Sequence, residues 1–183
     1  YGLDPDHLIH RLTFGVGTRL ITSHGASALD GVYKLVAVQD GNSWLPAIKV
    51  SDTPAKTPIP GEKRAWRIYD DQGKATADLL SLYDEPVQGM EQILLHHPSK
   101  PASFRILTRR EISGIEPLLV EILREGDLVY DLPSIEDMRA LREADVDRLY
   151  PGVKRLLNPH VYHVSLTERL WNLKQELVAS AME

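Results

Sequence analysis

Apolar and polar residues alternate most regularly in the middle of the chain. Residues 64–70 read RAWRIYD, and a period of two is typical of a half-buried strand. After a short turn, residues 75–83 continue the pattern. Residues 32–38 form a nearly continuous apolar run, as in a strand covered on both faces. Residues 44–50 indicate a further strand, in which Pro46 favours an edge position. We therefore predict a small antiparallel sheet.

Turn and loop signals separate the remaining segments. Residues 51–63 hold three prolines and a glycine and predict a loop. Residues 84–104 are interrupted by three more prolines and predict a mostly irregular segment. Apolar runs at residues 118–123 and 128–130 flank Glu125-Gly126, which predicts a hairpin.

Helix signals occur near both ends of the chain. Residues 4–12 predict a short helix that begins after an aspartate and a proline. Ser134 with Asp137 is a variant of the capping box and predicts a helix, and residues 151–158 predict another, short one. Residues 165–168 (SLTE) form a full capping box before a final amphipathic helix. Its apolar stripe must pack on another surface and consists of Leu166, Leu170, Leu173 and Leu177.

Composition narrows the possible functions. The chain has 183 residues, 43% of them hydrophobic, so it can form a packed core. Its net charge of -5 argues against a general nucleic-acid binder. It contains no cysteine, which excludes disulfides, thiolate catalysis and cysteine-ligated zinc. The polar residues 1–6 are unlike a signal peptide, and the apolar stretches are too short to cross a bilayer, so no membrane partner is predicted.

The strongest candidate site lies in residues 14–20 (FGVGTRL). Gly15 and Gly17 would let the backbone approach an anion, and successive N–H groups can form an anion-binding concavity. A plain tight turn is the alternative, and it is the more frequent meaning of an isolated G-x-G. Without a third glycine at dinucleotide spacing or a following Gly-Lys-Ser/Thr, the Rossmann and P-loop motifs are both excluded.

Other residue groups indicate chemistry less specifically. Seven basic residues along the predicted sheet could line an anionic pocket, although a solvated sheet face is the more common interpretation: Arg19, Lys34, Lys49, Lys56, Lys63, Arg64 and Arg67. Three tryptophans could stack on a planar ring, with core packing as the default: Trp44, Trp66 and Trp171. No Ser/His/Asp arrangement or close carboxylate pair is evident.

The seven histidines define no predicted site. His7 and His10 could share a helix face and a metal, but a surface pair is favoured because no acidic ligand is near. His96 and His97 would point to opposite faces of an extended stretch. The others are interpreted as loop, packing or capping residues: His24, His160 and His163.

An ordered set of segments resembles the C-terminal portion of nicotinate phosphoribosyltransferase. The set covers essentially the whole chain, and its order is more specific than any one piece. It comprises FGVGTRLITS (14–23), GVYKLV (31–36), K-x-S-x-x-P-x-K (49–56), P-G-x-K (60–63), RIYD (67–70), GDLVYDLP (126–133), RLLNPH (155–160) and LWNLKQEL (170–177).

The resemblance implies an architecture. In this family an irregular α/β barrel carries the active site, and a second, mixed domain is built from both chain ends. Residues 1–30 would supply the last part of the barrel, with its phosphate loops. Residues 31–183 would supply the C-terminal share of the mixed domain, an α+β fragment with a small antiparallel sheet and C-terminal helices. The resemblance also implies a cytoplasmic homodimer and an N-terminal part of the same polypeptide as a partner.

The resemblance implies a reaction as well. Nicotinate and phosphoribosyl pyrophosphate would give nicotinate mononucleotide and pyrophosphate, with Mg²⁺ and coupled ATP hydrolysis, in NAD biosynthesis. Gly15, Val16, Gly17 and Thr18 match the loop that holds the 5′-phosphate. Gly2 and Leu3 resemble the preceding phosphate loop, from which Tyr1 departs.

No catalytic residue and no metal ligand can be carried over to this chain, because the family's catalytic groups lie upstream. We therefore predict that the chain does not catalyse alone. Relatives also have several more residues between the helix at 4–12 and the strand that ends at Phe14, whereas only Thr13 stands there now. The sequence is therefore expected to be an incomplete or altered form of the natural protein.

Two other functions remain open from the sequence. One is a related phosphoribosyltransferase that acts on nicotinamide or quinolinate. The residues of the base pocket, which lie upstream, would decide between these substrates and nicotinate. The other is a non-catalytic module for ribose-phosphate binding or assembly, which would bind such ligands without turnover.

Overall fold

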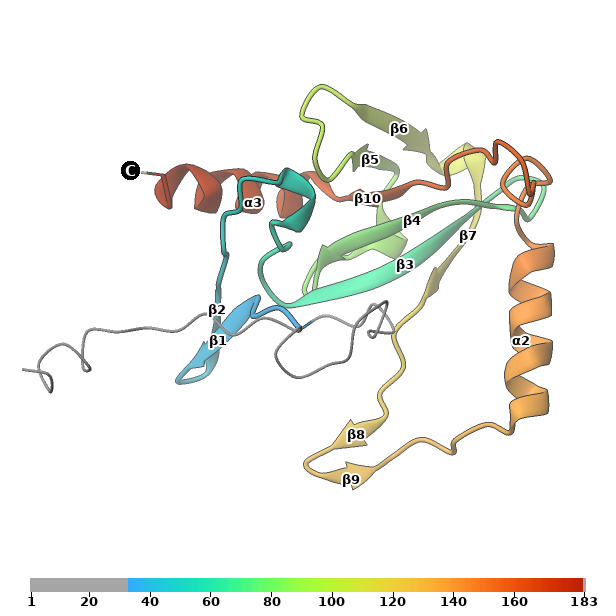
Figure 1. Cartoon of the computed structure of the whole chain (residues 1–183), viewed down its shortest axis with the longest axis horizontal. Helices are drawn as coiled ribbons and strands as arrows, with labels where there is room; N and C mark the ends of the chain where they lie inside the picture. The colour runs from blue at the N-terminus through green and yellow to red at the C-terminus, as the bar shows by residue number, and fades with distance from the viewer. Residues whose placement is uncertain (1–32, 183) are drawn as a thin grey trace, which may run out of the picture. The chain divides into compact units, whose positions relative to one another are not determined.

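The computed structural model describes residues 33–182, and their main element is a mixed six-stranded sheet (Figure 1). Its strands are β3 (Lys63–Asp70), β4 (Ala75–Leu82), β5 (Gln92–His96), β6 (Phe104–Thr108), β7 (Ile112–Pro117) and β10 (Val164–Leu166). They lie in the order β6-β5-β10-β4-β3-β7. The β10–β4 pair is parallel and the other pairs are antiparallel. The predicted small antiparallel sheet is therefore corrected to a larger mixed one, because β10 returns from far along the chain.

The alternation in β3 and β4 predicted the centre of this sheet correctly. Every second residue of β4 is buried, and so are Trp66 and Ile68 of β3. The connection is a tight turn in which Asp70 Oδ1 accepts hydrogen bonds from the backbone N–H groups of Gln72 and Lys74, at 3.0 and 2.9 Å. Gly73 has a φ of 70°, a conformation that glycine adopts without steric cost.

The prediction of a mostly irregular segment over residues 84–104 missed β5 and the first residue of β6, which pair as a hairpin. Their register runs from Gln92 opposite Thr108 to His96 opposite Phe104. The prolines that suggested irregular structure lie outside the strands, in the flanking loops. Proline cannot donate to a ladder, so it marks the ends of these strands and says little about the residues between.

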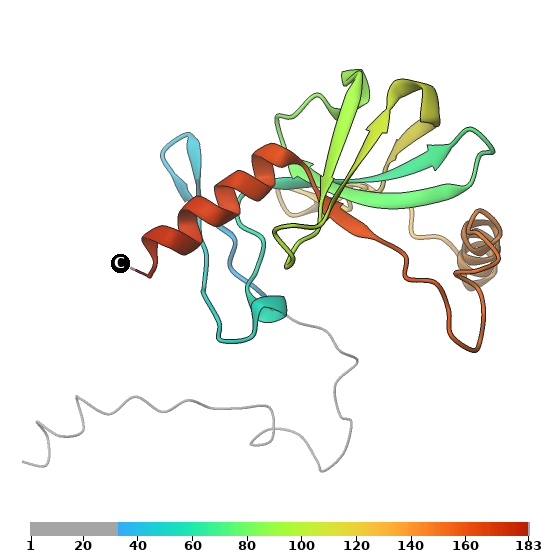
Figure 2. The same ribbon diagram turned by 90° about the horizontal axis from the view of Figure 1, so that it is seen from above.

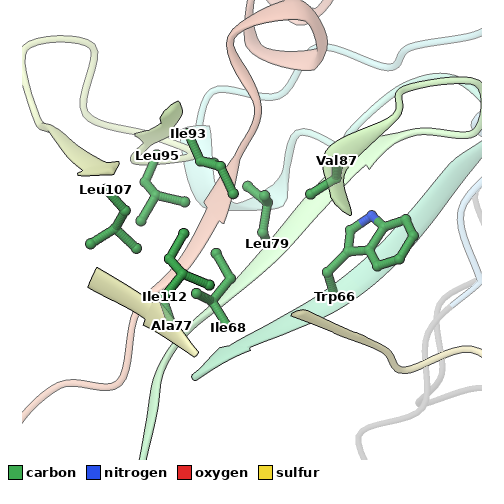
Figure 3. Packing of buried hydrophobic residues seen from close by; sticks show 9 residues of the cluster. All are labelled: Trp66, Ile68, Ala77, Leu79, Val87, Ile93, Leu95, Leu107 and Ile112. Carbon is green, nitrogen blue, oxygen red and sulfur yellow. The ribbon is translucent and has the colours of Figure 1, made fainter. Parts of the chain in front are cut away.

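The apolar core lies on one face of this sheet, which curls around it (Figures 2 and 3). Nine buried side chains from β3, β4, β5, β6, β7 and the loop after β4 meet there: Trp66, Ile68, Ala77, Leu79, Val87, Ile93, Leu95, Leu107 and Ile112. Residues two apart on a strand share a face, so the core is the direct product of the period-two pattern.

The C-terminal helix α3 (Glu168–Ser180) packs against β4 and β5. On the helix, the apolar stripe faces inward: Leu170 is fully buried, and Leu173 and Leu177 are half-buried. The position of the cap is corrected: Ser165 and Leu166 belong to β10, and Thr167 is the N-cap, whose side chain accepts from the Leu170 N–H at 3.4 Å.

The first strands of the described region form a separate two-stranded sheet. β1 (Ala37–Asp40) pairs with β2 (Ser43–Pro46) around a turn at Gly41, where φ is 57°. The prediction that residues 32–38 are covered on both faces is wrong, because Tyr33, Leu35 and Val38 are all exposed. A hairpin of two short strands covers neither of its own faces.

The second predicted hairpin is present but short. β8 (Leu123–Arg124) pairs with β9 (Asp127–Leu128), and the two turn residues Glu125 and Gly126 both have positive φ, as a two-residue hairpin turn requires. Short 3-10 turns complete the inventory of elements at η2 (Pro54–Lys56), η3 (Val87–Gly89) and η4 (Arg109–Glu111).

The predicted capping box begins helix α2 (Ile135–Asp147). Ser134 Oγ accepts from the Asp137 N–H at 3.1 Å, and Asp137 Oδ2 accepts from the Ser134 N–H at 3.1 Å. No side chain of α2 is buried within the described part of the chain.

The predicted helix at 151–158 is wrong. Successive turns stand there, with the backbone N–H of Val153 bonded to Tyr150 O at 3.0 Å. Asn158 has a positive φ, and the His160 N–H returns to Gly152 O at 2.9 Å. This close return requires a glycine, since a Cβ at position 152 would lie 2.5 Å from the His160 ring. The helix predicted over residues 4–12 lies outside the described residues.

Candidate functional site

The phosphate-binding residues predicted from the sequence all lie outside the described residues: Gly2, Leu3, Gly15, Val16, Gly17 and Thr18. Arg19, His7, His10 and His24 lie outside them too. The geometry that follows therefore concerns residues 33–182 alone.

The most extensive polar network of this region surrounds Arg67. Its guanidinium binds the Asp78 carboxylate through two bonds, Nε to Oδ1 at 2.9 Å and Nη2 to Oδ2 at 3.1 Å. The two residues face each other directly in the β3–β4 register. Tyr162 donates to Asp78 Oδ1 at 2.9 Å, and Asp145 of α2 lies 3.5 Å from Arg67 Nη1. The network thus connects β3 and β4 to α2 and to the loop before β10.

Charge pairing fixes the ionisation states in this network. The hydrogen bond to Asp78 raises the pKa of Arg67 above its already high value. Burial, and then the negative charge of Asp78, raises the pKa of Tyr162. Arg67 therefore stays charged and Tyr162 stays neutral at physiological pH, and their paired contacts give the network a structural role.

A second polar cluster connects β3 and β7 with the end of α2. Tyr69 donates to Glu116, and Arg148 Nη1 lies 2.8 Å from the Tyr69 hydroxyl and 3.2 Å from Glu116 Oε2. Burial and the bond to Glu116 raise the pKa of Tyr69. Beside it, Tyr150 donates to Asp70. Both clusters connect strands of the sheet to α2 and the loops beside it. They were not predicted from the sequence, because the contacts depend on strand register.

The buried carboxylate of Glu85 joins β4 to α3. Glu85 is 6% exposed, and its Oε2 accepts from Thr167 Oγ1 at 2.7 Å and from the Leu82 N–H at 2.6 Å. Thr167 is also the helix N-cap, so one hydroxyl serves both contacts. A buried charge is tolerated only when it is hydrogen-bonded, which both donors achieve.

A hollow of about 720 Å³ lies beside α3 and the β2 strand. Two half-exposed aromatic residues, Trp44 and Tyr83, contribute to its walls. Its charges are mainly negative, from Glu62, Asp84, Glu168 and Glu176, while Arg169 is paired with Asp84 at 2.9 Å. Such walls repel phosphate, so this hollow is a poor match for the predicted ligands.

The basic residues of the predicted sheet do not converge on one pocket. Lys63 Nζ donates to Gly61 O, and burial lowers the pKa of this lysine. Arg64 lies over the Tyr83 ring, 4.1 Å from its centroid, and Arg67 binds Asp78. Three lysines lie on exposed parts of the chain: Lys34, Lys49 and Lys56. The described residues therefore give no support to a shared anionic-substrate pocket on this sheet.

The tryptophans and the adjacent histidines are placed by packing. Trp66 is buried, as expected, and Trp44 is 52% exposed, contrary to the core expectation. The ring of Trp171 stacks on His96 with centroids 4.9 Å apart. Neither ring nitrogen of His96 has a hydrogen-bond partner in the described region. His97 lines a small hollow that His96 does not line, in agreement with the prediction that the two side chains point to opposite faces.

Nothing in residues 33–182 gathers three or more histidine or carboxylate side chains in a geometry that could hold a metal ion. The helices of the same region are also too short or too polar to cross a bilayer.

Comparison with known proteins gives consistent results. Residues 62–174 match the family described as the nicotinate phosphoribosyltransferase C-terminal domain. Nicotinate phosphoribosyltransferase of Homo sapiens is 38% identical over 165 residues, which is 90% of this chain and 29% of the human one. The Bacillus subtilis enzyme of the same name is 31% identical over 166 residues, 90% of this chain and 33% of the bacterial one.

A solved structure agrees with these matches. The crystal structure of human nicotinic acid phosphoribosyltransferase superimposes with a TM-score of 0.57 at 35% identity, over 66% of this chain and 23% of that chain. The chain thus spans about a third of the length of the curated relatives that it matches.

Proposed function

Because this chain belongs to the nicotinate phosphoribosyltransferase family, through that family's C-terminal domain, we propose that it is part of an enzyme of NAD biosynthesis. The enzyme joins nicotinate to the ribosyl phosphate of phosphoribosyl pyrophosphate and releases pyrophosphate. The observation that carries the proposal is sequence identity of 31–38% over 90% of the chain with the human and Bacillus enzymes.

The proposed contribution of residues 1–30 is binding of the 5′-phosphate. Glycines at positions 15 and 17 would bring backbone N–H groups close to the phosphate oxygens, and the Thr18 hydroxyl would add a donor. Gly2 and Leu3 would form the neighbouring loop. Donors fixed in advance around the 5′-phosphate hold the ribosyl group in position for attack by nicotinate at C1, where the bond to pyrophosphate breaks.

The proposed contribution of residues 31–183 is structural. Their polar networks around Arg67 and Glu85 are internally paired, as expected of a domain that supports a barrel. In this proposal the barrel and the remainder of the mixed domain come from the N-terminal part of the polypeptide. Mg²⁺ and ATP are bound outside residues 33–182, and the protein acts as a cytoplasmic homodimer.

Direct assay tests the function. The 183 residues alone should leave nicotinate unchanged, whereas a polypeptide of the relatives' full length that contains them should form nicotinate mononucleotide from nicotinate and phosphoribosyl pyrophosphate. Chromatography of the products, with and without Mg²⁺ and ATP, measures the conversion. Faster turnover of nicotinamide or quinolinate would replace the proposed substrate, and ribose-phosphate binding without turnover of any base would favour a binding module.

Two glycine-to-alanine variants, one in the proposed phosphate loop and one control, test the role of that loop. Gly17→Ala should raise the KM for phosphoribosyl pyrophosphate by about tenfold, equivalent to ~1.4 kcal/mol of lost binding. Gly89→Ala is the control, since a Cβ at position 89 would meet nothing within 4 Å. Equal KM values for the two variants would remove position 17 from the proposed phosphate site.

A further inference from the structure

A small hollow with basic and hydroxyl-bearing walls lies at the open edge of the core, where β5, β6 and β10 end. Its volume is about 170 Å³, against roughly 30 Å³ for one water in the liquid. The polar side chains that line it are His97, Ser103, Arg105, His163 and Ser165. No Asp or Glu is among the residues that form its walls in the described part of the chain.

Strand register explains how this hollow arises. Arg105 lies opposite Leu95 in the β5–β6 ladder, and Ser165 lies beside Leu79 in the β10–β4 ladder. Leu79 and Leu95 are core residues, so Arg105 and Ser165 share the core face of the sheet. His97 lies two residues beyond Leu95 and His163 two residues before Ser165. The rows of apolar side chains that form the core thus continue into cationic and hydroxyl groups.

Arg105 gives the wall of the hollow a permanent positive charge. Lys100 and His163 add to burial in lowering the pKa of His97, as nearby positive charges do. Arg105 Nη1 is held by Thr76 Oγ1 at 3.1 Å, so the guanidinium is positioned by a neutral partner.

Two carboxylates close to lining residues of the hollow, those of Asp78 and Glu111, are hydrogen-bonded to other groups. Asp78 is adjacent to Ala77, which lines the hollow, but its carboxylate binds Arg67 and Tyr162 on the opposite face. Glu111 lies close enough to be influenced by Arg105, yet its carboxylate accepts from both the N–H and the hydroxyl of Thr108, at 2.8 and 2.7 Å. Arg105 and the two histidines therefore face the hollow without a carboxylate lining it.

We propose that this hollow binds a phosphate group, held by Arg105, His97 and His163 with hydroxyl donors from Ser103 and Ser165. A guanidinium matches the geometry of a phosphate, and imidazolium and hydroxyl groups supply further donors around it. The site lies in the C-terminal domain and includes none of residues 14–18, so it does not depend on the proposed reaction. The acidic hollow beside α3 provides the internal contrast, since its walls carry the opposite charge.

The experiment is NMR of the full-length protein with ¹³Cε1-labelled histidine, titrated with inorganic phosphate and, separately, with glycerol phosphate at constant ionic strength. His97→Gln and His163→Gln assign the two resonances. We expect both to shift saturably and their pKa values to rise in phosphate, because a bound anion favours the charged imidazole. Arg105→Gln should weaken phosphate binding by about tenfold, the effect of losing one charge-assisted contact. Arg110→Gln, an equal charge change on an exposed residue outside the hollow, should leave it unchanged.

The outcomes are distinguishable. Saturation by inorganic phosphate alone identifies a free anion as the ligand, and saturation by glycerol phosphate as well identifies a site that accepts esters. Absence of a shift at His97 and His163 overturns the proposal and favours occupation by a carboxylate of the same polypeptide. Equal weakening of phosphate binding by Arg105→Gln and Arg110→Gln also overturns the proposal, because the loss would then come from a long-range change in charge and not from a contact in the hollow. The resonances of phosphate-free Arg105→Gln, compared with the wild type, verify folding, and the two histidine variants repeat the test if that variant unfolds.

Discussion

The curled sheet and the segment of residues 118–147 both carry many large apolar side chains, but their burial is opposite. Every second residue of β4 is buried, and Leu79 is fully enclosed. In residues 118–147, by contrast, large apolar side chains remain exposed: Leu119, Val120, Ile122, Leu123, Leu128, Val129, Leu132, Ile135, Met138 and Leu141. Local signals suffice to form the hairpin β8–β9 and the helix α2. Burial additionally needs a facing surface, which the sheet provides by curling.

Truncation of one leucine in each region should give the largest difference. Leu79→Ala removes a side chain from the closed core and should cost the 183-residue chain about 2–5 kcal/mol of unfolding free energy. Leu141→Ala removes an exposed side chain of α2 and should change it by less than about 0.5 kcal/mol. Urea denaturation measures both. Equal losses would mean that residues 118–147 are buried in solution, and the contrast between the regions would then fail.

The sequence predicted the parts of the fold in which a local pattern and its burial coincide. β3, β4 and the turn at Gly73 followed from alternation and turn chemistry, and the cap of α2 from Ser134 and Asp137. β5 and β6 were missed because the flanking prolines dominated the segment. The network of Arg67 and Asp78 was not predictable, since their pairing depends on register.

The candidate functional residues also comprise a part that the sequence predicted and a part that it did not. The glycine loop at residues 15–18 was found by its motif, and its role stays a prediction because it lies outside the described residues. The hollow around Arg105 has no motif, because its residues come from three separate strands or strand ends. Only the ladders of β5–β6 and β10–β4 bring them to one face. The predicted position of the N-cap of α3 was wrong for a similar reason. The capping pattern fits Ser165, but pairing with β4 holds that residue in a strand.

Removal of each helix cap tests the same contrast between buried and exposed regions, with an expected effect of intermediate size. Thr167→Ala removes the cap of α3 and one of the two hydrogen bonds to the buried carboxylate of Glu85, so it should cost about 2–4 kcal/mol. Ser134→Ala removes only the exposed cap of α2 and should cost about 1 kcal/mol. Thermal or urea unfolding of the two variants gives the difference. Equal costs would show that burial adds nothing to the cap of α3.

The pH dependence of α2 should give the smallest effect. Hydrogen bonds from the Ser134 hydroxyl and backbone N–H lower the pKa of Asp137 below its usual value of about 3.9. Between the folded and unfolded pKa values the unfolded chain binds more protons, so the unfolding free energy rises with pH. The contribution is complete above the unfolded value and is lost as the pH falls through the folded one.

Asp137→Asn should therefore lower the thermal midpoint slightly near pH 6 and match the wild type near pH 2.5. Glu136→Gln, in the same helical turn, is the control for the charge near the helix N-terminus and should show a smaller pH dependence. Circular dichroism of each variant between pH 2.5 and 6 makes the measurement. If Asp137→Asn and Glu136→Gln changed with pH alike, the effect would come from charge near the helix end, and the hydrogen bonds of the capping box would contribute nothing specific.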